Sequence, residues 1–187
     1  GCPVIPVYVD LGDYGGPDHR ARARATVETL AAYAPSEEME LHAVDAGDVV
    51  TTLSAEMDVL RMLALRRFML ATAEAVAEDV GAVGVVTWEA IGQKSSQTSA
   101  NLAVTDAAVT LPVHRPLLTM DKADITNLAR DIGTFEDATV DTGCNRVAPE
   151  LPETNASLAT LRSAEPDDLF ERARASAAAR DVVPIEK

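Results

Sequence analysis

A run of small polar side chains follows a strand-like apolar segment near the middle of the chain: Glu89-Ala90-Ile91-Gly92-Gln93-Lys94-Ser95-Ser96-Gln97-Thr98. The backbone amides near Gly92, the charge of Lys94 and the side-chain amide of Gln97 could hold a phosphate group or the edge of a base at a helix N-terminus. Polar loops also follow strands that bind nothing. Composition alone therefore leaves a ligand site and a plain loop equally open.

A second candidate group is a cysteine in the polar loop Asp141-Thr142-Gly143-Cys144-Asn145-Arg146. A thiol near a cation tends toward thiolate, which is the nucleophilic form of cysteine. A cysteine that serves packing usually lies in an apolar run, so this loop favours a catalytic role for Cys144. Cys2 precedes an apolar run instead and is interpreted as a small hydrophobic residue.

Two adjacent arginines, Arg66 and Arg67, interrupt an otherwise apolar helical pattern. One interpretation is that both arginines lie on a solvated helix face, where the aliphatic parts of their side chains cover apolar surface. The other is recognition of phosphate by the planar guanidinium groups. The histidines His19, His42 and His114 share no metal-ligand spacing with each other or with the cysteines, so the sequence predicts no metal site.

An alternation of strands and helices has to position these groups. Apolar or alternating segments predict strands at 4–11, 39–44, 82–87 and 111–117. Helical spacing predicts helices at about 18–34, 49–80 with a break near Ser54, 121–133, 155–163 and 166–179.

The strand at 82–87 is expected to be central and buried on both faces. The two prolines of 111–117 predict that this strand lies at an edge or ends early. Asp121 is the predicted N-cap of the helix that Gly133 ends. The fold class is therefore α/β, a sandwich with a mostly parallel sheet whose ligands bind beyond the carboxyl ends of the strands.

The composition limits what the molecule can be. At 187 residues the chain is long enough for one domain with a hydrophobic core. No apolar run approaches the roughly 20 residues that span a membrane. The formal charge of -14 opposes unspecific binding of nucleic acid and is typical of adaptation to a salty cytoplasm. We expect a cytoplasmic protein without a membrane partner, and a fragment of a longer one because the chain starts at Gly1 without Met.

Several segments together resemble a known family. The resemblance lies in three segments: Thr87-Trp88-Glu89-Ala90-Ile91-Gly92-Gln93-Lys94-Ser95-Ser96-Gln97-Thr98-Ser99-Ala100-Asn101-Leu102, Leu111-Pro112-Val113-His114-Arg115-Pro116-Leu117 and Met120-Asp121-Lys122. Together they are similar to the adenylation domain of tRNA 4-thiouridine synthetases. These enzymes are also called tRNA sulfurtransferases or thiamine-biosynthesis sulfurtransferases and belong to the PP-loop ATP pyrophosphatases. The similarity continues through the Cys144 loop to the C-terminal helices.

The resemblance implies a three-layer sandwich like that of the adenine nucleotide α-hydrolases, with residues 1–187 as a single, partial adenylation domain. It also implies that ATP, with Mg²⁺, activates a tRNA uridine: the 4-oxygen attacks the α-phosphate, pyrophosphate leaves, and sulfur then displaces AMP. Sulfur transfer to the thiazole of thiamine is a further expectation.

The resemblance assigns roles to individual positions. Val9, Asp10, Arg66 and Gln97 match family residues that contact the nucleotide, and Cys144 matches the cysteine that carries persulfide sulfur. Trp88 stands where the family has a glycine of the nucleotide site, so its indole is expected either to block the pocket or to stack on the base.

Parts of the family pattern are absent from this sequence. The phosphate-binding loop Ser-Gly-Gly-x-Asp-Ser, with its strand, should precede Gly1, and the THUMP module that captures RNA is also absent. tRNA is therefore expected to bind through missing N-terminal domains. The resemblance also implies that a persulfide donor such as a cysteine desulfurase supplies the sulfur, and that two copies of the chain form a homodimer. Two alternatives stay open: a non-catalytic remnant that binds a nucleotide or a partner, and another PP-loop enzyme such as an ammonia-dependent synthetase.

Overall fold

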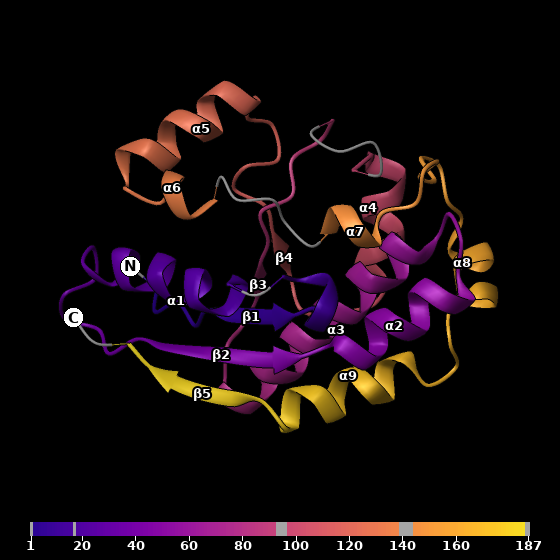
Figure 1. Ribbon diagram of the computed structural model, residues 1–187, viewed down its shortest axis with the longest axis horizontal. Helices are drawn as coiled ribbons and strands as arrows, with labels where there is room; N and C mark the ends of the chain where they lie inside the picture. The colour runs from indigo at the N-terminus through magenta and orange to yellow at the C-terminus, as the bar shows by residue number, and fades with distance from the viewer. Residues whose placement is uncertain (1, 17, 93–96, 139–143, 186–187) are drawn as a thin grey trace.

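The computed structural model describes residues 2–16, 18–92, 97–138 and 144–185 and has an α/β architecture, as the sequence predicts (Figure 1). Its strands are β1 (Val7–Asp10), β2 (Glu40–Asp45), β3 (Val85–Val86), β4 (Val113–His114) and β5 (Asp181–Pro184). Its helices are η1 (Gly12–Tyr14), α1 (His19–Ala31), α2 (Gly47–Glu56), α3 (Arg61–Val80), α4 (Ser99–Asp106), α5 (Lys122–Asp131), α6 (Phe135–Ala138), α7 (Cys144–Val147), α8 (Leu158–Ala164) and α9 (Leu169–Ala178).

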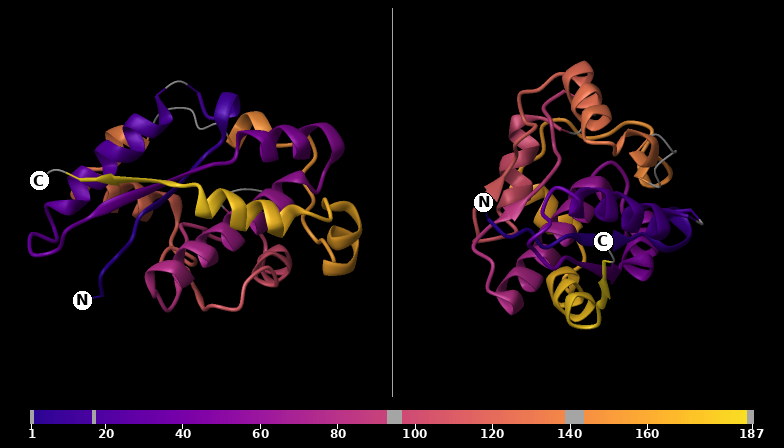
Figure 2. Two further views of the ribbon diagram at one scale, coloured as in Figure 1. Left: turned by 90° about the horizontal axis from the view of Figure 1, so that it is seen from below. Right: turned by 90° about the vertical axis from the view of Figure 1, so that its left-hand side faces the viewer.

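The strands of the described residues form two sheets. In the first, β1 pairs in parallel with β2, and β2 pairs in the antiparallel direction with β5; in the second, β3 pairs in parallel with β4. Figure 2 (left) shows the first sheet crossing the molecule with α1 on one side and α3 on the other. Two of these three pairings are parallel, as expected. The sequence patterns do not predict β5, because a strand with only two central apolar residues carries too little periodic signal.

The strand predicted at 82–87 is shorter and more exposed than expected. β3 comprises only Val85 and Val86; the first is buried, whereas the second is 65% exposed. Within the described residues β3 pairs with β4 alone and packs against α3. One face of β3 therefore stays open, and the prediction that this strand is buried on both faces is wrong.

The segment predicted as one helix at 49–80 forms two helices. α2 ends at Glu56, Met57 has an extended backbone (φ -118°, ψ 144°), and α3 begins at Arg61. The break thus lies just beyond Ser54, where the sequence predicts it. α3 ends at Gly81, whose φ of 73° lies in the left-handed region that glycine adopts without a Cβ clash.

The main hydrophobic core lies where α2, α3, α8 and α9 pack together. Its most deeply buried large side chains are Leu53, Leu63, Phe68, Leu161 and Leu169. Each such side chain stabilises the fold by about 1.5–3 kcal/mol relative to an exposed one. In a smaller hydrophobic cluster, α1 and the residue after β5 pack against β2. The buried members of this cluster are Val27, Ala31, Leu41 and Ile185.

α5 begins and ends as the sequence predicts. The Asp121 carboxylate accepts a hydrogen bond from the backbone N–H of Asp124 (2.9 Å), and Gly133 follows the helix with a φ of 81°. α5 and α6 form an outlying pair at the top of Figure 1, and α6 packs against α1. Within the part of the chain that the structure describes, no helix is long and apolar enough to cross a membrane.

Candidate functional site

The carboxyl ends of β1 and β2 are shaped by two aspartates and two glycines. Asp10 accepts a hydrogen bond from the N–H of Gly12 (3.0 Å), and Asp45 accepts one from the N–H of Gly47 (2.8 Å). The glycines touch: a Cβ on Gly12 would lie 3.0 Å from the Cα of Gly47, and Gly12 has a φ of 59°. η1 therefore packs directly on the start of α2, and a side chain on Gly12 would separate them.

Val9 and Asp10 lie at the end of β1, opposite Val44 and Asp45 of β2. Val9 packs against the main core from its edge, whereas Asp10 presents its carboxylate beyond the strand. Burial, followed by the charge of Asp10, raises the pKa of the neighbouring Tyr8 to about 12. The carboxyl end of β1 is thus a negatively charged rim, where a hydroxyl-bearing ligand would find an acceptor.

A buried charge network lies beyond the ends of β3 and β4, with Glu89 at its centre. One oxygen of Glu89 accepts hydrogen bonds from Arg115 Nε (2.8 Å) and Thr87 Oγ1 (3.1 Å), and the other lies 3.9 Å from Nε of Arg66. Arg115 also binds both carboxylate oxygens of Asp106 on α4. Burial alone would lower the pKa of Arg115, but the hydrogen bonds with Asp106 and Glu89 raise it. The network ties α3 and α4 to the ends of these two strands.

The adjacent arginines of α3 have different environments. The side chain of Arg66 is 12% exposed and faces the charge network. The side chain of Arg67 is 1% exposed and forms a bidentate ion pair with Glu165 (2.8 and 3.1 Å), and it donates to the carbonyl of Val104. Both interpretations of the pair, a solvated face and phosphate recognition, are therefore wrong for Arg67, which joins α3 to α4 and to the end of α8. Arg66 stays a candidate for a nucleotide contact.

Gln97 lies two residues before the start of α4 and is the strongest candidate for a ligand-binding group. Its side chain is 1% exposed, yet within the described residues neither its amide nitrogen nor its amide oxygen has a hydrogen-bond partner. An unpaired buried polar group costs about 1–3 kcal/mol, so it calls for an explanation such as a bound ligand. The next residue, Thr98, caps α4 by accepting from the N–H of Asn101 (3.2 Å). Gln97 thus lies at a helix N-terminus, which favours an anion.

Trp88 lies between β3 and the charge network and is 64% exposed. Most of the indole is therefore accessible, as stacking on a base requires. Ile91, three residues on, is also exposed, and its N–H donates to the carbonyl of Leu118. Lys94 lies outside the described residues.

Cys144 is the first residue of α7, and its side chain lies outside the described part of the structure. α7 packs against η1 beyond the end of β1. Arg61, at the start of α3, donates to the carbonyls of Val147 and Ala148 and so holds the main chain that follows the cysteine. Cys2 is exposed, which disagrees with its interpretation as a packed hydrophobic residue.

The segment after α7 continues to the N-terminus of α4. Thr98 Oγ1 donates to the carbonyl of Thr154 (2.7 Å), and Asn101 Nδ2 donates to that of Glu153 (2.8 Å). The residues after Cys144 are thus attached both to η1 and to the helix that follows Gln97. Whether the thiol and the polar turn share one pocket stays a prediction.

Sequence reasoning missed Glu89, Asp106 and Arg115 as members of the site. The available signal was a pair of opposite charges: Glu89, two residues beyond the strand predicted at 82–87, and Arg115, within the strand predicted at 111–117. Neighbouring parallel strands bring such residues together at one edge of a sheet. In the part of the chain that the structure describes, no group of three or more His, Cys, Asp or Glu residues could hold a metal ion.

Comparisons with known proteins agree on one kind of relative. Residues 1–169 match the model of the family described as thiamine biosynthesis protein (ThiI). The chain is 59% identical over its whole length to a probable tRNA sulfurtransferase of Halobacterium salinarum and covers 47% of that protein. It is 34% identical over 88% of its length to a probable tRNA sulfurtransferase of Clostridium acetobutylicum and covers 43% of that protein.

A solved structure is similar over nearly the whole chain. It is a crystal structure of a 4-thiouridine synthetase–RNA complex with bound ATP, 30% identical in sequence, with a TM-score of 0.85 over 97% of this chain and 48% of that one. The chain therefore spans about half the length of the proteins that it matches.

Proposed function

The chain belongs to the ThiI family, and from this premise we propose that it is the ATP-using part of a tRNA sulfurtransferase, which activates a uridine of tRNA and replaces its 4-oxygen by sulfur. The names of the relatives and the ATP and RNA in the similar structure support this proposal. Sulfur transfer to the thiazole of thiamine is a second activity that we propose for the same site.

The observation that carries the proposal is the buried, unpaired amide of Gln97 at the start of α4. A phosphate oxygen or the edge of adenine would satisfy this amide, which within the described residues has no partner. Arg66 supplies a positive charge for phosphate, because a guanidinium binds phosphate oxygens through two N–H groups. The exposed indole of Trp88 stacks on the base, and Val9 and Asp10 border the adenine or the ribose.

The reaction needs two separable parts. In the first, the uridine 4-oxygen attacks the α-phosphate of ATP and pyrophosphate leaves; Arg66 stabilises the charge that develops there, and Mg²⁺ accompanies the ATP. In the second, the terminal sulfur of a persulfide on Cys144 attacks the activated carbon and AMP leaves with the former 4-oxygen. A second thiol, supplied from outside the described residues, then attacks Cys144 Sγ, so that the S–S bond to the uridine sulfur breaks and leaves 4-thiouridine and a disulfide at Cys144. Holding both reactants at one place lowers the barrier of the attack on the activated carbon.

The finer fold is proposed to be the three-layer sandwich of the PP-loop ATP pyrophosphatases. Within the described residues, β1 pairs on one side only with β2, and β3 on one side only with β4. A phosphate-loop strand from the remainder of the protein would join the two sheets into one. We propose further that tRNA binds through additional domains and that a cysteine desulfurase or similar donor supplies the persulfide. Two copies of the protein form a homodimer, and the protein works in the cytoplasm.

The test separates the two parts of the reaction. The gene in its native host is altered to encode Cys144→Ala, and 4-thiouridine is measured in the total tRNA by liquid chromatography. Cys2→Ala is the matched control, because it removes the other of the two cysteines. We expect Cys144→Ala to abolish 4-thiouridine while the purified protein still releases pyrophosphate in the presence of tRNA. Normal 4-thiouridine in Cys144→Ala, or loss of pyrophosphate release, contradicts the proposed role.

A further inference from the structure

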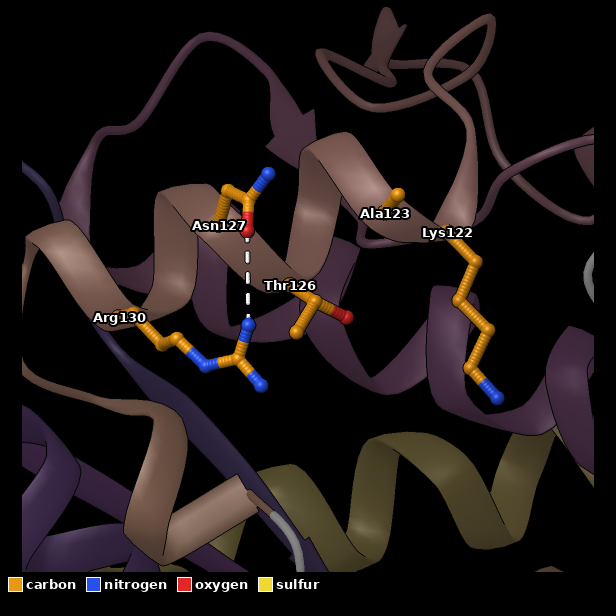
Figure 3. Close-up of a pocket in the computed structure, with 5 residues that line it drawn as sticks. All are labelled: Lys122, Ala123, Thr126, Asn127 and Arg130. Carbon is orange, nitrogen blue, oxygen red and sulfur yellow. Dashed lines mark hydrogen bonds between the residues drawn. The ribbon is translucent and has the colours of Figure 1, made fainter.

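A recess of about 440 Å³ runs along α5 (Figure 3), and within the described residues its lining comes from that helix alone, between Lys122 and Arg130. Ligand pockets enclose most of a ligand's surface, which a recess with a single wall does not. The carboxylates of Asp121, Asp124 and Asp131, on or next to α5, also outnumber its two cations. The α5 recess therefore has neither the walls nor the charge of an anion site.

Arg61, the first residue of α3, contacts the main chain that follows Cys144. Its Nε donates to the carbonyl of Val147 (2.5 Å), and its Nη2 donates to the carbonyl of Ala148 (3.2 Å). These carbonyls lie at the end of α7, where the carbonyl groups of a helix have no partners within the helix. A basic side chain stabilises such an end by donating to them. Arg61 therefore caps the end of α7, the one-turn helix that begins at Cys144.

α7 depends on contacts with other elements, because a single helical turn is not stable alone. The Val147 side chain is 1% exposed and lies in the main core. Arg146 adds a contact at the limit of hydrogen-bond length, from its Nη1 to the carbonyl of Asp13 on η1 (3.5 Å). Arg61 ties the main chain of α7 to α3. Without Arg61, Val147 would still anchor the turn in the core, but the orientation of the turn would be less restricted.

The same helix α3 carries Arg66, which faces the Glu89 network and is the proposed contact of the ATP phosphates. Arg61 and Arg66 are five residues apart, or about 7.5 Å along the helix axis. The buried side chains of Leu63 and Phe68 anchor this part of α3 in the main core. One rigid helix therefore supports both the arginine proposed to bind the nucleotide and the turn that begins with the residue proposed to carry sulfur.

We propose that Arg61 is a positioning residue for sulfur transfer: by holding the main chain of α7 against α3, it determines where Cys144 lies relative to the activated uridine. This inference rests on the proposed function, in which a persulfide on Cys144 attacks the activated carbon. Displacing a reacting group by about 1 Å lowers a rate by about 100-fold. Adenylation uses Arg66 and does not use Cys144, so loss of Arg61 should slow only the second step.

The test measures the two steps separately, in a single turnover of the full-length protein that a cysteine desulfurase has first charged with persulfide. After ATP and tRNA are added, Arg61→Ala is expected to release pyrophosphate at the unsubstituted rate and to form 4-thiouridine about 100-fold more slowly. A quench with dithiothreitol supplies the second thiol before 4-thiouridine is measured. Sodium sulfide should restore 4-thiouridine in Arg61→Ala, because hydrosulfide attacks the activated carbon directly and AMP leaves without any contribution from Cys144.

Two further variants complete the test. Arg172→Ala is the matched control, because Arg172 is also half-buried and joins α9 to Thr52 of α2 (3.2 Å); both steps should stay normal. Arg61→Lys keeps the positive charge but lacks the planar fork that donates to two carbonyls. It should therefore slow 4-thiouridine formation less than Arg61→Ala does, and it decides the question if Arg61→Ala does not fold. The amides of 144–148 should exchange hydrogen faster in both Arg61 variants.

Normal pyrophosphate release with slow 4-thiouridine formation that sulfide restores supports the proposal. Equal loss of both steps in a folded Arg61 variant, or normal 4-thiouridine formation, overturns it. A defect that sulfide does not relieve also overturns it, because the activated uridine is then not formed. Unchanged hydrogen exchange at 144–148 overturns it too, because α7 is then held without Arg61. Normal 4-thiouridine in Cys144→Ala overturns the proposed function itself, so the two failures are distinguishable.

Discussion

Replacing Gln97 by methionine should make the ligand-free protein more stable and its ATP binding weaker. Methionine has nearly the same length and volume as glutamine and no polar atoms to satisfy. Within the described residues the Gln97 amide has no hydrogen-bond partner, so the folded chain bears the cost of its desolvation until a ligand binds.

The magnitude follows from the burial of the amide. An unsatisfied buried polar group costs about 1–3 kcal/mol, so removing the amide should raise the free energy of unfolding by about 2 kcal/mol. For a chain of this size such a gain raises the Tm by roughly 6 °C. Loss of a hydrogen bond to a charged phosphate, worth about 1.5–3 kcal/mol, should weaken ATP binding by roughly 10-fold to 100-fold.

The assay is thermal unfolding with and without ATP, followed by circular dichroism, together with calorimetric titration of ATP. Asn101→Leu is the matched control, because the Asn101 amide is equally buried but donates to the carbonyl of Glu153 and accepts from the N–H of Ala156. The control should lower the Tm. If Gln97→Met lowers the Tm as the control does, or leaves ATP affinity unchanged, the amide is not held for a ligand and the reasoning fails.

Two further predictions concern stability. Glu165→Gln leaves the charge of Arg67 buried without its partner, so urea denaturation should show a loss of about 3–5 kcal/mol, whereas the double variant Arg67→Met/Glu165→Met should recover most of it. If Glu165→Gln is as stable as the unsubstituted chain, the Arg67 charge does not depend on Glu165 in the folded state and the prediction is wrong. Desolvation, then the charge of Arg180, lowers the pKa of His42, whose Nδ1 accepts from Arg180 Nε (2.9 Å). The unfolded chain then binds more protons than the folded one, so the free energy of unfolding should fall as the pH decreases below the ordinary histidine pKa of 6.5. The midpoint of urea denaturation measures this fall, and the midpoint should decrease less with pH in His42→Asn than in the unsubstituted chain.

Local signals in the sequence predict most of the elements. The N-cap Asp121 and the terminal Gly133 define α5 almost to the residue, because a capping hydrogen bond and a positive φ depend only on neighbours in the chain. The strand β1 and the helices α1 and α9 likewise lie within the predicted segments, and β2 and α8 each extend one residue beyond theirs. The quoted run from Thr87 to Leu102 also indicates the family to which the comparisons assign the chain.

Only the tertiary structure distinguishes residues of the same type. Arg66 and Arg67 are neighbours with equal charge, but a helix turns about 100° per residue, so one faces the Glu89 network and the other the core. In the same way, Gln97 and Asn101 are both buried amides, and only the packing of the segment after α7 gives the second its partners. Most of the elements, their caps and the family follow from the sequence alone, because they depend on local periodicity and motif. Which polar groups are paired and which are left for a ligand depends on contacts between residues far apart in the chain, so it was decided by the fold.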